Sequence, residues 1–401
     1  MSSSKFVGAC VVMVHIGLEQ LLSSPPGWLK SSRIGLLSNQ ASTGRDLRHS
    51  RFHLLEKFPG QLTCLFSPQH GFFAEKQDNM IESAHSADPE TGLTIYSLYG
   101  ESRRPDPIMF RQFDVLIIDI VDVGTRVYTF LYTMAYCLEL AAELGKKVIV
   151  LDRPNPVGGL AVEGNILEPA WTSFVGLYPL PMRHGMTFGE LALLINSEFA
   201  LGADLEVVMM QGWQRPMLFR DTGFPWVFPS PNMPTPETAL VYPGQVIWEG
   251  TMVSEGRGTT LPFELCGAPY WRWGEIAELL QATELPGCRL RPITFEPVAG
   301  KYAGQTCCGF HLHVLEPSRF LPYRTSLALL QAVAHLYPQQ FSYKEPPYEY
   351  EYERLPLDLI LGSQRLRKQL ENMIPLTEIE MGWQSELTEF IEKRDNYLLY
   401  S

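Results

Sequence analysis

Five short apolar runs, each closed by turn-forming residues, constrain the fold of this chain more than any other feature. They occupy residues 34–37, 62–66, 115–120, 148–151 and 205–210. Short runs without polar alternation are typical of parallel strands, which are buried on both faces. The first half of the chain is therefore predicted to contain a parallel sheet.

Segments with helical periodicity separate these runs. Between residues 126 and 147, apolar side chains such as Phe130, Met134 and Leu138 recur at helical spacing, which predicts an amphipathic helix. Thr187 and Glu190 have the spacing of a capping box at the start of another helix. An order of strand, helix and strand implies right-handed crossovers and an α/β fold.

A proline-rich stretch at 224–244 separates this half from a second half of different character. Proline cannot donate a hydrogen bond to a sheet, so we expect an ordered irregular connector there. Helical patterns follow at 273–285, 325–336, 357–373 and 376–393, with strand-like alternation at 289–295 and 310–315. We predict two domains, residues 1–242 and 243–401, of which the second is a smaller α+β domain.

Composition excludes some classes of partner. The net charge of −12 disfavours nucleic-acid binding, because an acidic chain repels phosphate backbones. The apolar stretch at 6–14 is short for a signal peptide and much too short to cross a bilayer. The seven scattered cysteines fit a mostly reduced protein. We expect a cytoplasmic protein without a membrane partner, with export as the open alternative, and the sequence predicts no particular oligomeric state.

Polar clusters follow four of the predicted strands. They are Ser38-Asn39-Gln40, Ser67-Pro68-Gln69-His70-Gly71, Asp119-Ile120-Val121-Asp122 and Asp152-Arg153-Pro154-Asn155-Pro156. Such residues also form ordinary turns. Ligands of open parallel sheets, however, bind outside the carboxyl ends of the strands. The four clusters together therefore predict one polar site.

Several familiar chemistries lack their motifs. The chain has no G-x-S-x-G nucleophile elbow, no G-x-x-x-x-G-K-[ST] phosphate loop, no G-x-G-x-x-G after the first strand and no H-E-x-x-H zinc motif. His70 with Asp119 and Asp122 is the metal-site alternative, and the spacing of these residues is unspecific. We expect neither a metal nor a cofactor.

Hydrolysis of a glycoside needs a proton donor for the leaving oxygen and often a second carboxylate. Acidic candidates near the predicted site are Glu75, Glu82, Asp119, Asp122, Glu163, Glu249 and Glu255. Glu255 lies in a glycine-rich loop, 254–260, where N–H groups can face a ligand. A single Glu is more often a surface residue. His184 precedes a predicted helix, where packing explains it as well as substrate contact does.

Short motifs occur in a fixed order between residues 30 and 270. They include Phe66-Ser-Pro-Gln-His-Gly-Phe72, Asp119-Ile-Val-Asp-Val-Gly-Thr-Arg-Val-Tyr128, Leu151-Asp-Arg-Pro-Asn-Pro156, Val162-Glu-Gly164, Arg183-His-Gly-Met186, Pro229-Ser-Pro-Asn-Met-Pro-Thr235 and Ser254-Glu-Gly-Arg-Gly-Thr259. As a set they resemble the NamZ family, whose characterised members look like exo-acting hydrolases that remove β-linked N-acetylmuramic acid (MurNAc) from the non-reducing end of peptidoglycan fragments. The resemblance implies a Rossmann-like domain joined to a smaller C-terminal domain, a site in the cleft between them, and no nucleotide or metal cofactor.

The resemblance breaks at one position that bears on catalysis. The family's usual motif after the second strand is Ser-Pro-Glu-His-Gly, and its Glu is the favoured catalytic acid; this chain has Gln69 there. An amide has no proton to give at working pH. Either another carboxylate supplies the proton, or the chain binds sugar without cleaving it. Our hypothesis is that Glu75 is the acid, with its pKa raised by burial beside Phe72 and Phe73.

We predict a glycoside hydrolase that releases β-linked MurNAc from muropeptides or MurNAc-GlcNAc saccharides. Glu75, His70 and Gln69 form the predicted catalytic group, and Arg257 is expected to pair with the lactyl carboxylate through its guanidinium fork. The predicted substrate-binding residues are Asn39, Asp119, Asp122, Arg126, Asp152, Arg153, Asn155, Glu163, His184, Asn232, Glu255 and Arg257. The alternatives are a non-catalytic saccharide-binding protein, which Gln69 favours, a hydrolase or transferase for another glycoside, and a structural scaffold.

Overall fold

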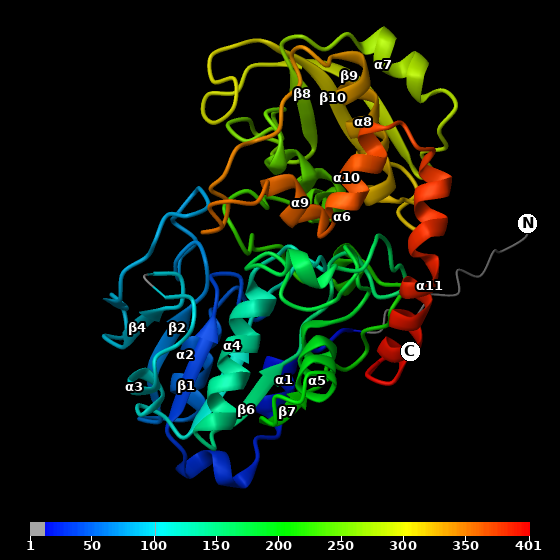
Figure 1. Ribbon diagram of the computed structural model, residues 1–401. Coiled ribbons are helices and arrows are strands. Elements are labelled where there is room, and N and C mark those ends of the chain that lie inside the picture. Colours follow the sequence, from blue (N-terminus) through cyan, green and yellow to red (C-terminus); the bar gives the residue numbers. More distant parts are fainter. Residues whose placement is uncertain (1–12, 101) are drawn as a thin grey trace, which may run out of the picture.

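The computed structural model describes residues 13–100 and 102–401 of the chain. Two sheets organise it, one of seven strands and one of three, and they lie at opposite ends of the molecule (Figure 1). Most of the apolar stretch at 6–14 lies outside the described residues. Within the described part, no helix is long and apolar enough to cross a membrane.

The larger sheet has the strand order β3-β4-β2-β1-β5-β6-β7. Its parallel strands are β1 (Ile34–Ser38), β2 (Leu62–Ser67), β4 (Thr94–Ser97), β5 (Val115–Asp119), β6 (Lys147–Leu151) and β7 (Asp204–Val208). The two-residue β3 (Ser86–Ala87) pairs antiparallel with β4 at one edge. The predicted parallel sheet is confirmed, and β3 and β4 are added to it.

Helices on both faces of this sheet explain why its strands are apolar without alternation. In β5, Val115 and Ile117 join the cluster of α1 (Gly17–Ser23) and α2 (Ser50–Lys57). Leu116 and Ile118 join the opposite cluster, with α4 (Phe130–Glu143) and α5 (Phe188–Glu198). A strand covered on both faces has no solvent side, so all of β5 is buried. The short α3 (Pro107–Phe110) precedes β5.

The smaller sheet is antiparallel, with the order β8 (Leu265–Ala268), β10 (Cys307–Val314) and β9 (Cys288–Phe295). The helices of this half are α6 (Pro236–Gln245), α7 (Trp273–Leu280), α8 (Pro322–Leu336), α9 (Pro356–Leu361), α10 (Gln364–Glu371) and α11 (Leu376–Asp395). The expected fold class, a parallel α/β part followed by a smaller α+β part, is confirmed.

Three predicted segments differ in the structure. The prediction of an irregular connector is wrong at the end of the proline-rich stretch, because α6 starts there. Pro236 lies in the first turn of this helix, where a missing N–H costs nothing. The helix expected at 357–373 is split at Gly362, which adopts a left-handed φ of 68° and ends α9. The helix expected from residue 126 begins only at Phe130. The boundary at 242/243 stays a prediction, and α6 runs across it.

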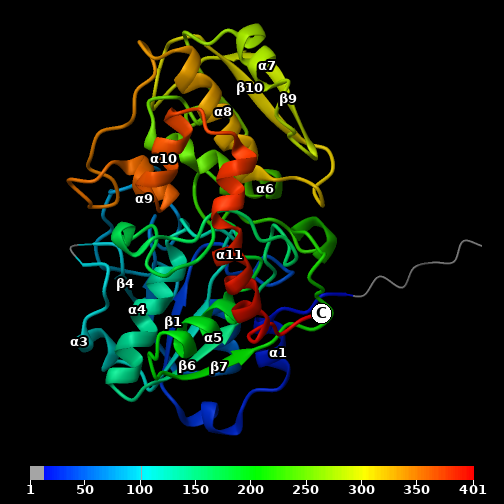
Figure 2. The same cartoon turned by 45° about the vertical axis from the view of Figure 1, so that its right-hand side comes forward.

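The C-terminal segment ties the second half back to the first. Helix α11 descends from the smaller sheet along the side of the larger one (Figures 1 and 2). Beyond it, the Tyr400 hydroxyl donates to Asp152 at 2.6 Å, and the Leu399 N–H donates to Glu190 at 2.8 Å. Thr187 and Glu190 form the predicted capping box of α5. Because Leu399 bonds to Glu190, the C-terminal residues contact the start of that helix.

Arg126 is a second tie between the halves. Its side chain is fully buried, and its guanidinium donates to the carbonyls of Asn165 and Leu180 in the first half and of Ile360 and Leu361 in α9, over 2.8 to 3.1 Å. Burial lowers the pKa of this guanidinium. One side chain therefore satisfies carbonyl groups from two parts of the chain that are far apart in sequence.

We expect Arg126→Met to lower the free energy of unfolding by at least about 3 kcal/mol, since each unsatisfied buried carbonyl costs about 1–3 kcal/mol. Chemical denaturation followed by fluorescence measures this change. The matched control is Arg220→Met, since Arg220 is half exposed and makes only a loose ion pair with Glu237, so a change within about 0.5 kcal/mol is expected. Equal losses in the two variants would show that Arg126 is not a structural tie.

Candidate functional site

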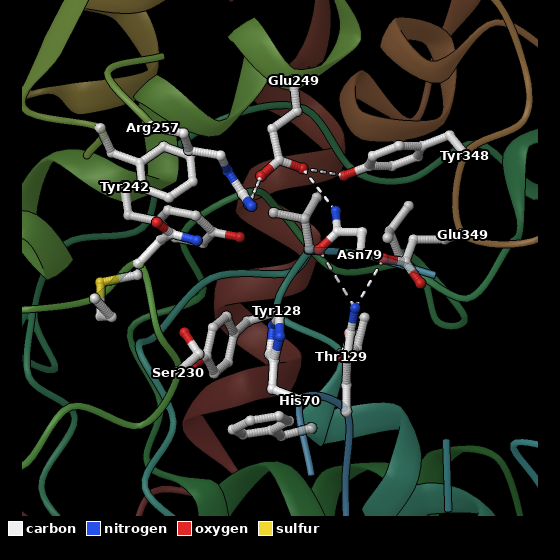
Figure 3. A pocket seen from close by; sticks show the side chains of 17 residues that line it. His70, Asn79, Tyr128, Thr129, Ser230, Tyr242, Glu249, Arg257, Tyr348 and Glu349 are labelled. Carbon is white, nitrogen blue, oxygen red and sulfur yellow. Dashed lines mark hydrogen bonds and ion pairs between the residues drawn. The ribbon is translucent and has the colours of Figure 1, made fainter. Parts of the chain in front are cut away.

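A pocket lies where loops of the two halves meet, and we call it the central pocket (Figure 3). Its polar lining consists of Gln69, His70, Asn79, Tyr128, Thr129, Ser230, Asn232, Tyr242, Glu249, Arg257, Tyr348 and Glu349. Its apolar lining consists of Val127, Phe130, Val175, Met233 and Phe263. This mixture of apolar walls and convergent polar groups is typical of small-ligand sites.

The loop after β2 brings Gln69 and His70 into the central pocket. His70 has a φ of 75° and Gly71 a φ of 82°, so the chain turns through two left-handed residues directly after the strand. For a residue with a Cβ atom this conformation costs about 1 kcal/mol or more. Strained backbone of this kind is common at functional sites, and here it directs the imidazole toward the pocket.

Glu349 enters the pocket from the segment between α8 and α9, and its backbone is also left-handed, with a φ of 48°. The side chain is buried. One carboxyl oxygen accepts from the Tyr99 hydroxyl at 2.6 Å, and the other accepts from the Gln69 amide at 2.9 Å. Burial raises the pKa of Glu349 to about 7, although these two donors act in the opposite direction.

Glu249 is the second buried carboxyl group of the pocket, in the 3₁₀-helix Val246–Gly250. One oxygen accepts from the Arg257 guanidinium at 2.5 Å. The other accepts from the Tyr348 hydroxyl at 2.7 Å and the Asn79 amide at 3.2 Å. Burial alone would raise the pKa of Glu249, but the charge of Arg257 and the hydrogen bond from Tyr348 outweigh it and hold the pKa below its usual value.

The pocket therefore holds two carboxyl groups in opposite states near neutral pH. Glu249 is an anion paired with a cation, whereas Glu349 keeps its proton up to about pH 7. Asn79 connects them, because its amide group contacts Glu249 on one side and Gln69 on the other (Figure 3). Carboxyl groups whose pKa values are pushed apart are the usual arrangement of a general acid and its anionic partner.

His70 is neutral in this site. Burial lowers the pKa of His70 to about 4, and the nearby Arg257 acts in the same direction. Nδ1 lies 2.8 Å from the carbonyl oxygen of Lys76. Because a carbonyl only accepts, Nδ1 carries the proton, and Nε2 is left with a lone pair. His70 can therefore accept a hydrogen bond from a ligand hydroxyl.

Four of the predicted site residues line the central pocket: Gln69, His70, Asn232 and Arg257. Arg257 pairs with Glu249 at 2.5 Å and approaches Glu255 at 3.4 Å, so carboxylates of the protein already compensate its charge. Glu255 lies behind it and also pairs with Lys301 at 2.7 Å. The glycine-rich loop thus supplies a cation that compensates Glu249, and the pairing of Arg257 with a lactyl group stays a prediction.

The hypothesis that Glu75 is a buried acid is wrong in its premise. Glu75 is exposed and does not line the pocket. Its carboxylate folds back to accept from the N–H of Phe73 at 3.3 Å, and Phe73 itself is 42% exposed. The loop after Gly71 carries Glu75 outward to solvent, so the burial that the hypothesis requires is absent.

The structure brings the polar residues at three of the four predicted strand ends together, but it does not place them in the lining of the central pocket. Asp119 and Arg153 form a buried bidentate ion pair, at 2.5 and 2.9 Å, and Arg153 also donates to the carbonyl of Thr43. Asn39 donates to the carbonyl of Val121 at 3.0 Å. These strand ends bind one another, because loops beyond β1, β5 and β6 close over them. The pocket is lined from further along these loops, by Gln69 and His70 after β2, Tyr128 and Thr129 after β5, and Val175 after β6.

The other predicted binding residues serve the packing of loops. Asp152 accepts from Thr187 and Tyr400, Asn155 donates to the carbonyl of Met186, and Glu163 accepts from the N–H of Arg324. His184 is fully buried and accepts from the N–H of Met186. Asp122 accepts from the N–H of Gly124, and Arg126 is the tie described above. None of these six lines the central pocket. The metal-site alternative has no geometric support among the described residues, where no group of three His, Cys, Asp or Glu side chains could hold an ion.

Sequence reasoning missed much of the second half's contribution, above all Tyr348 and Glu349. They lie in the segment 346–352, Pro-Pro-Tyr-Glu-Tyr-Glu-Tyr, which carries no recognised motif. Glu249 was among the acidic candidates but not among the predicted site residues. The density of tyrosine and glutamate at 348–352 was the available signal, since aromatic and acidic side chains together are common in saccharide sites.

Comparisons with known proteins identify the family of this chain. The model of the N-terminal part of exo-beta-N-acetylmuramidase NamZ matches residues 34–237, and the model of its C-terminal part matches residues 240–400. The peptidoglycan beta-N-acetylmuramidase NamZ of Bacillus subtilis (strain 168) is 43% identical over 387 residues, which cover 96% of this chain and 91% of that protein.

Two solved structures share the fold over nearly their whole length. Both are DUF1343 family proteins of Bacteroides fragilis NCTC 9343. One is 32% identical with a TM-score of 0.88, covering 97% of this chain and 100% of the other. The second is 30% identical with a TM-score of 0.75, covering 97% and 99%. With both family models matched in order along the chain, this protein belongs to the NamZ exo-β-N-acetylmuramidase family.

Proposed function

We propose that this chain is an exo-acting glycosidase that removes β-linked MurNAc from the non-reducing end of peptidoglycan fragments, and that the central pocket is its active site. The observation that carries the proposal is the pair of buried carboxyl groups, Glu249 and Glu349, in one pocket with opposite protonation states. The family and the name of the Bacillus subtilis relative support the substrate class.

The reaction needs both states. Cleavage of a glycosidic bond passes through a transition state that resembles an oxocarbenium ion, so an anion beside the sugar ring stabilises it. A carboxyl group that still holds its proton near neutral pH can protonate the leaving oxygen. Glu249 is fixed as the anion by Arg257, and a protonated group lies in the same pocket.

Neutral polar groups of the pocket suit the hydroxyl and acetamide groups of a pyranose. His70 offers the lone pair of Nε2, and Asn79 and Asn232 offer amides. Tyr128 places a buried hydroxyl in the pocket beside Ser230, where it can hydrogen-bond to a sugar hydroxyl. The rings of Tyr128 and Tyr242 pack edge to face at 5.9 Å, which fixes one wall of the site.

We expect the purified protein to release free MurNAc from MurNAc-β-1,4-GlcNAc, detected by chromatography and mass spectrometry, and to leave GlcNAc-β-1,4-MurNAc intact. The second disaccharide contains the same sugars in reverse order, so it is the matched control for exo-action on a terminal MurNAc. A terminal GlcNAc lacks the lactyl group, and equal cleavage of both compounds would replace the proposal with a general hexosaminidase.

The saccharide-binding alternative makes the opposite prediction in the same assay. A protein that lost its acid with the change to Gln69 would bind MurNAc-β-1,4-GlcNAc in calorimetry without releasing any product. Glu349 argues against this alternative, because the pocket keeps a carboxyl group that holds a proton although residue 69 is an amide.

We also propose that the protein acts in the cytoplasm, on fragments taken up during wall turnover. Six cysteines of the described residues are free thiols, which fits a reducing compartment. Fractionation of cells that express the full-length chain is expected to place it with cytoplasmic markers, and its recovery in the culture medium or periplasm would contradict the proposal.

A further inference from the structure

We propose that Glu349 is the general acid of this enzyme and that Gln69 is the positioning residue that holds it. This inference rests on the proposed glycosidase activity and assigns a catalytic residue on the C-terminal side of the pocket. Glu349 lines the pocket, is buried, and lies beside the position where the N-terminal motif would otherwise place an acid.

The contacts of Gln69 fix its orientation. Its carbonyl oxygen accepts from the Thr129 hydroxyl at 2.5 Å, so its NH₂ group points to the opposite side. That group donates to Glu349 at 2.9 Å and to the Tyr99 oxygen at 3.2 Å. Thr129 precedes α4 in the first half of the chain, and Glu349 precedes α9 in the second half. Because Gln69 bonds to both residues, it connects the two halves of the pocket at Glu349.

An amide at position 69 has a consequence for the proton. If residue 69 were a carboxyl group at 2.9 Å from Glu349, the two groups would compete for one proton. An amide is neutral at every working pH and only donates through its NH₂ group. The proton of the site therefore stays on Glu349. The backbone of residues 349 and 350, with φ values of 48° and 64°, holds this side chain against the pocket.

Other charged and titratable groups face Glu349 and set its environment. The anion Glu249 favours the protonated form, whereas the hydrogen bonds from Tyr99 and Gln69 and the cation Arg103 favour the ionised form. The remaining titratable neighbours are the phenols of Tyr242, Tyr348 and Tyr350. Burial of these phenols raises their pKa values above 10, so none of them titrates with Glu349.

The chemical step balances with these groups alone. The proton of Glu349 passes to the glycosidic oxygen while the bond from that oxygen to C1 breaks, and the bonding electron pair stays on the oxygen. GlcNAc leaves as an alcohol, and a water molecule adds to C1. The water releases one proton when it adds to C1, and Glu349 takes up one proton again. Protons and electrons therefore balance, and no oxidant, reductant or metal enters the step.

The test compares Glu349→Gln with the wild type on two substrates. MurNAc-β-1,4-GlcNAc needs a protonated leaving group, whereas 2,4-dinitrophenyl β-MurNAc releases a stable phenolate. We expect kcat/KM of Glu349→Gln to fall by at least about 100-fold on the disaccharide and by less than about tenfold on the dinitrophenyl glycoside. Glu75→Gln is the matched control, because Glu75 is exposed and lies outside the pocket, and it is expected to keep wild-type rates on both.

The outcomes separate the two proposals. A wild type that cleaves neither substrate would defeat the proposed function. A wild type that cleaves both, with Glu349→Gln impaired equally on both or on neither, would overturn Glu349 as the acid. Retained binding of the disaccharide and an unchanged melting temperature are expected, since glutamine keeps the shape of the side chain.

Gln69→Glu provides a second test that does not depend on removing Glu349. The wild-type kcat/KM is expected to fall as pH rises through about 7, where Glu349 loses its proton. A carboxylate at position 69 disfavours ionisation of Glu349, so the falling limb should move to higher pH. Because the new carboxyl group could itself act as the acid, Gln69→Glu is compared with the same variant carrying Glu349→Gln. A limb that stays in place in Gln69→Glu, or that is unchanged when Glu349→Gln is added, would overturn the assignment.

Discussion

Two buried carboxyl groups share the central pocket with one guanidinium, that of Arg257, among the lining residues. A charge taken out of water is unfavourable unless it is paired. Arg257 pairs with Glu249, so the second carboxyl group, Glu349, avoids the cost by keeping its proton. His70 is neutral for the same reason, since burial beside Arg257 disfavours a second cation. The division of charge in this pocket determines the chemistry that the site can perform.

The fold brings these groups together from distant parts of the chain. Gln69 and Glu349 are in contact although 280 residues separate them. Such a contact depends on the two halves keeping their relative position. Arg126 and the C-terminal segment after α11 both cross between the halves, the first through buried and the second through partly buried hydrogen bonds. The strained residues His70 and Glu349 lie on the two facing loops, where this stable frame supports them.

The sequence predicted the architecture well and the site only in part. The parallel strands, the capping box of α5 and the two-part fold follow from local patterns, because periodicity and turn chemistry act over a few residues. The site depends on tertiary contacts. The polar residues at strand ends resembled a ligand site, but Asp119 and Arg153 satisfy one another. Glu75 and Glu349 both have aromatic residues nearby in sequence, and only the fold decides that one is exposed and the other buried. The motif after β2 correctly indicated one wall of the pocket.

The most direct measurement is the titration of the two carboxyl groups by ¹³C NMR on protein labelled at the glutamate side-chain carboxyl carbon, with Glu249→Gln and Glu349→Gln used to assign the signals. The account predicts that Glu349 titrates near pH 7. It also predicts that the pKa of Glu249 lies below the usual value of a glutamate, so that Glu249 is ionised at neutral pH. A Glu349 signal that titrates at an ordinary glutamate pKa, or two groups that titrate together, would contradict it.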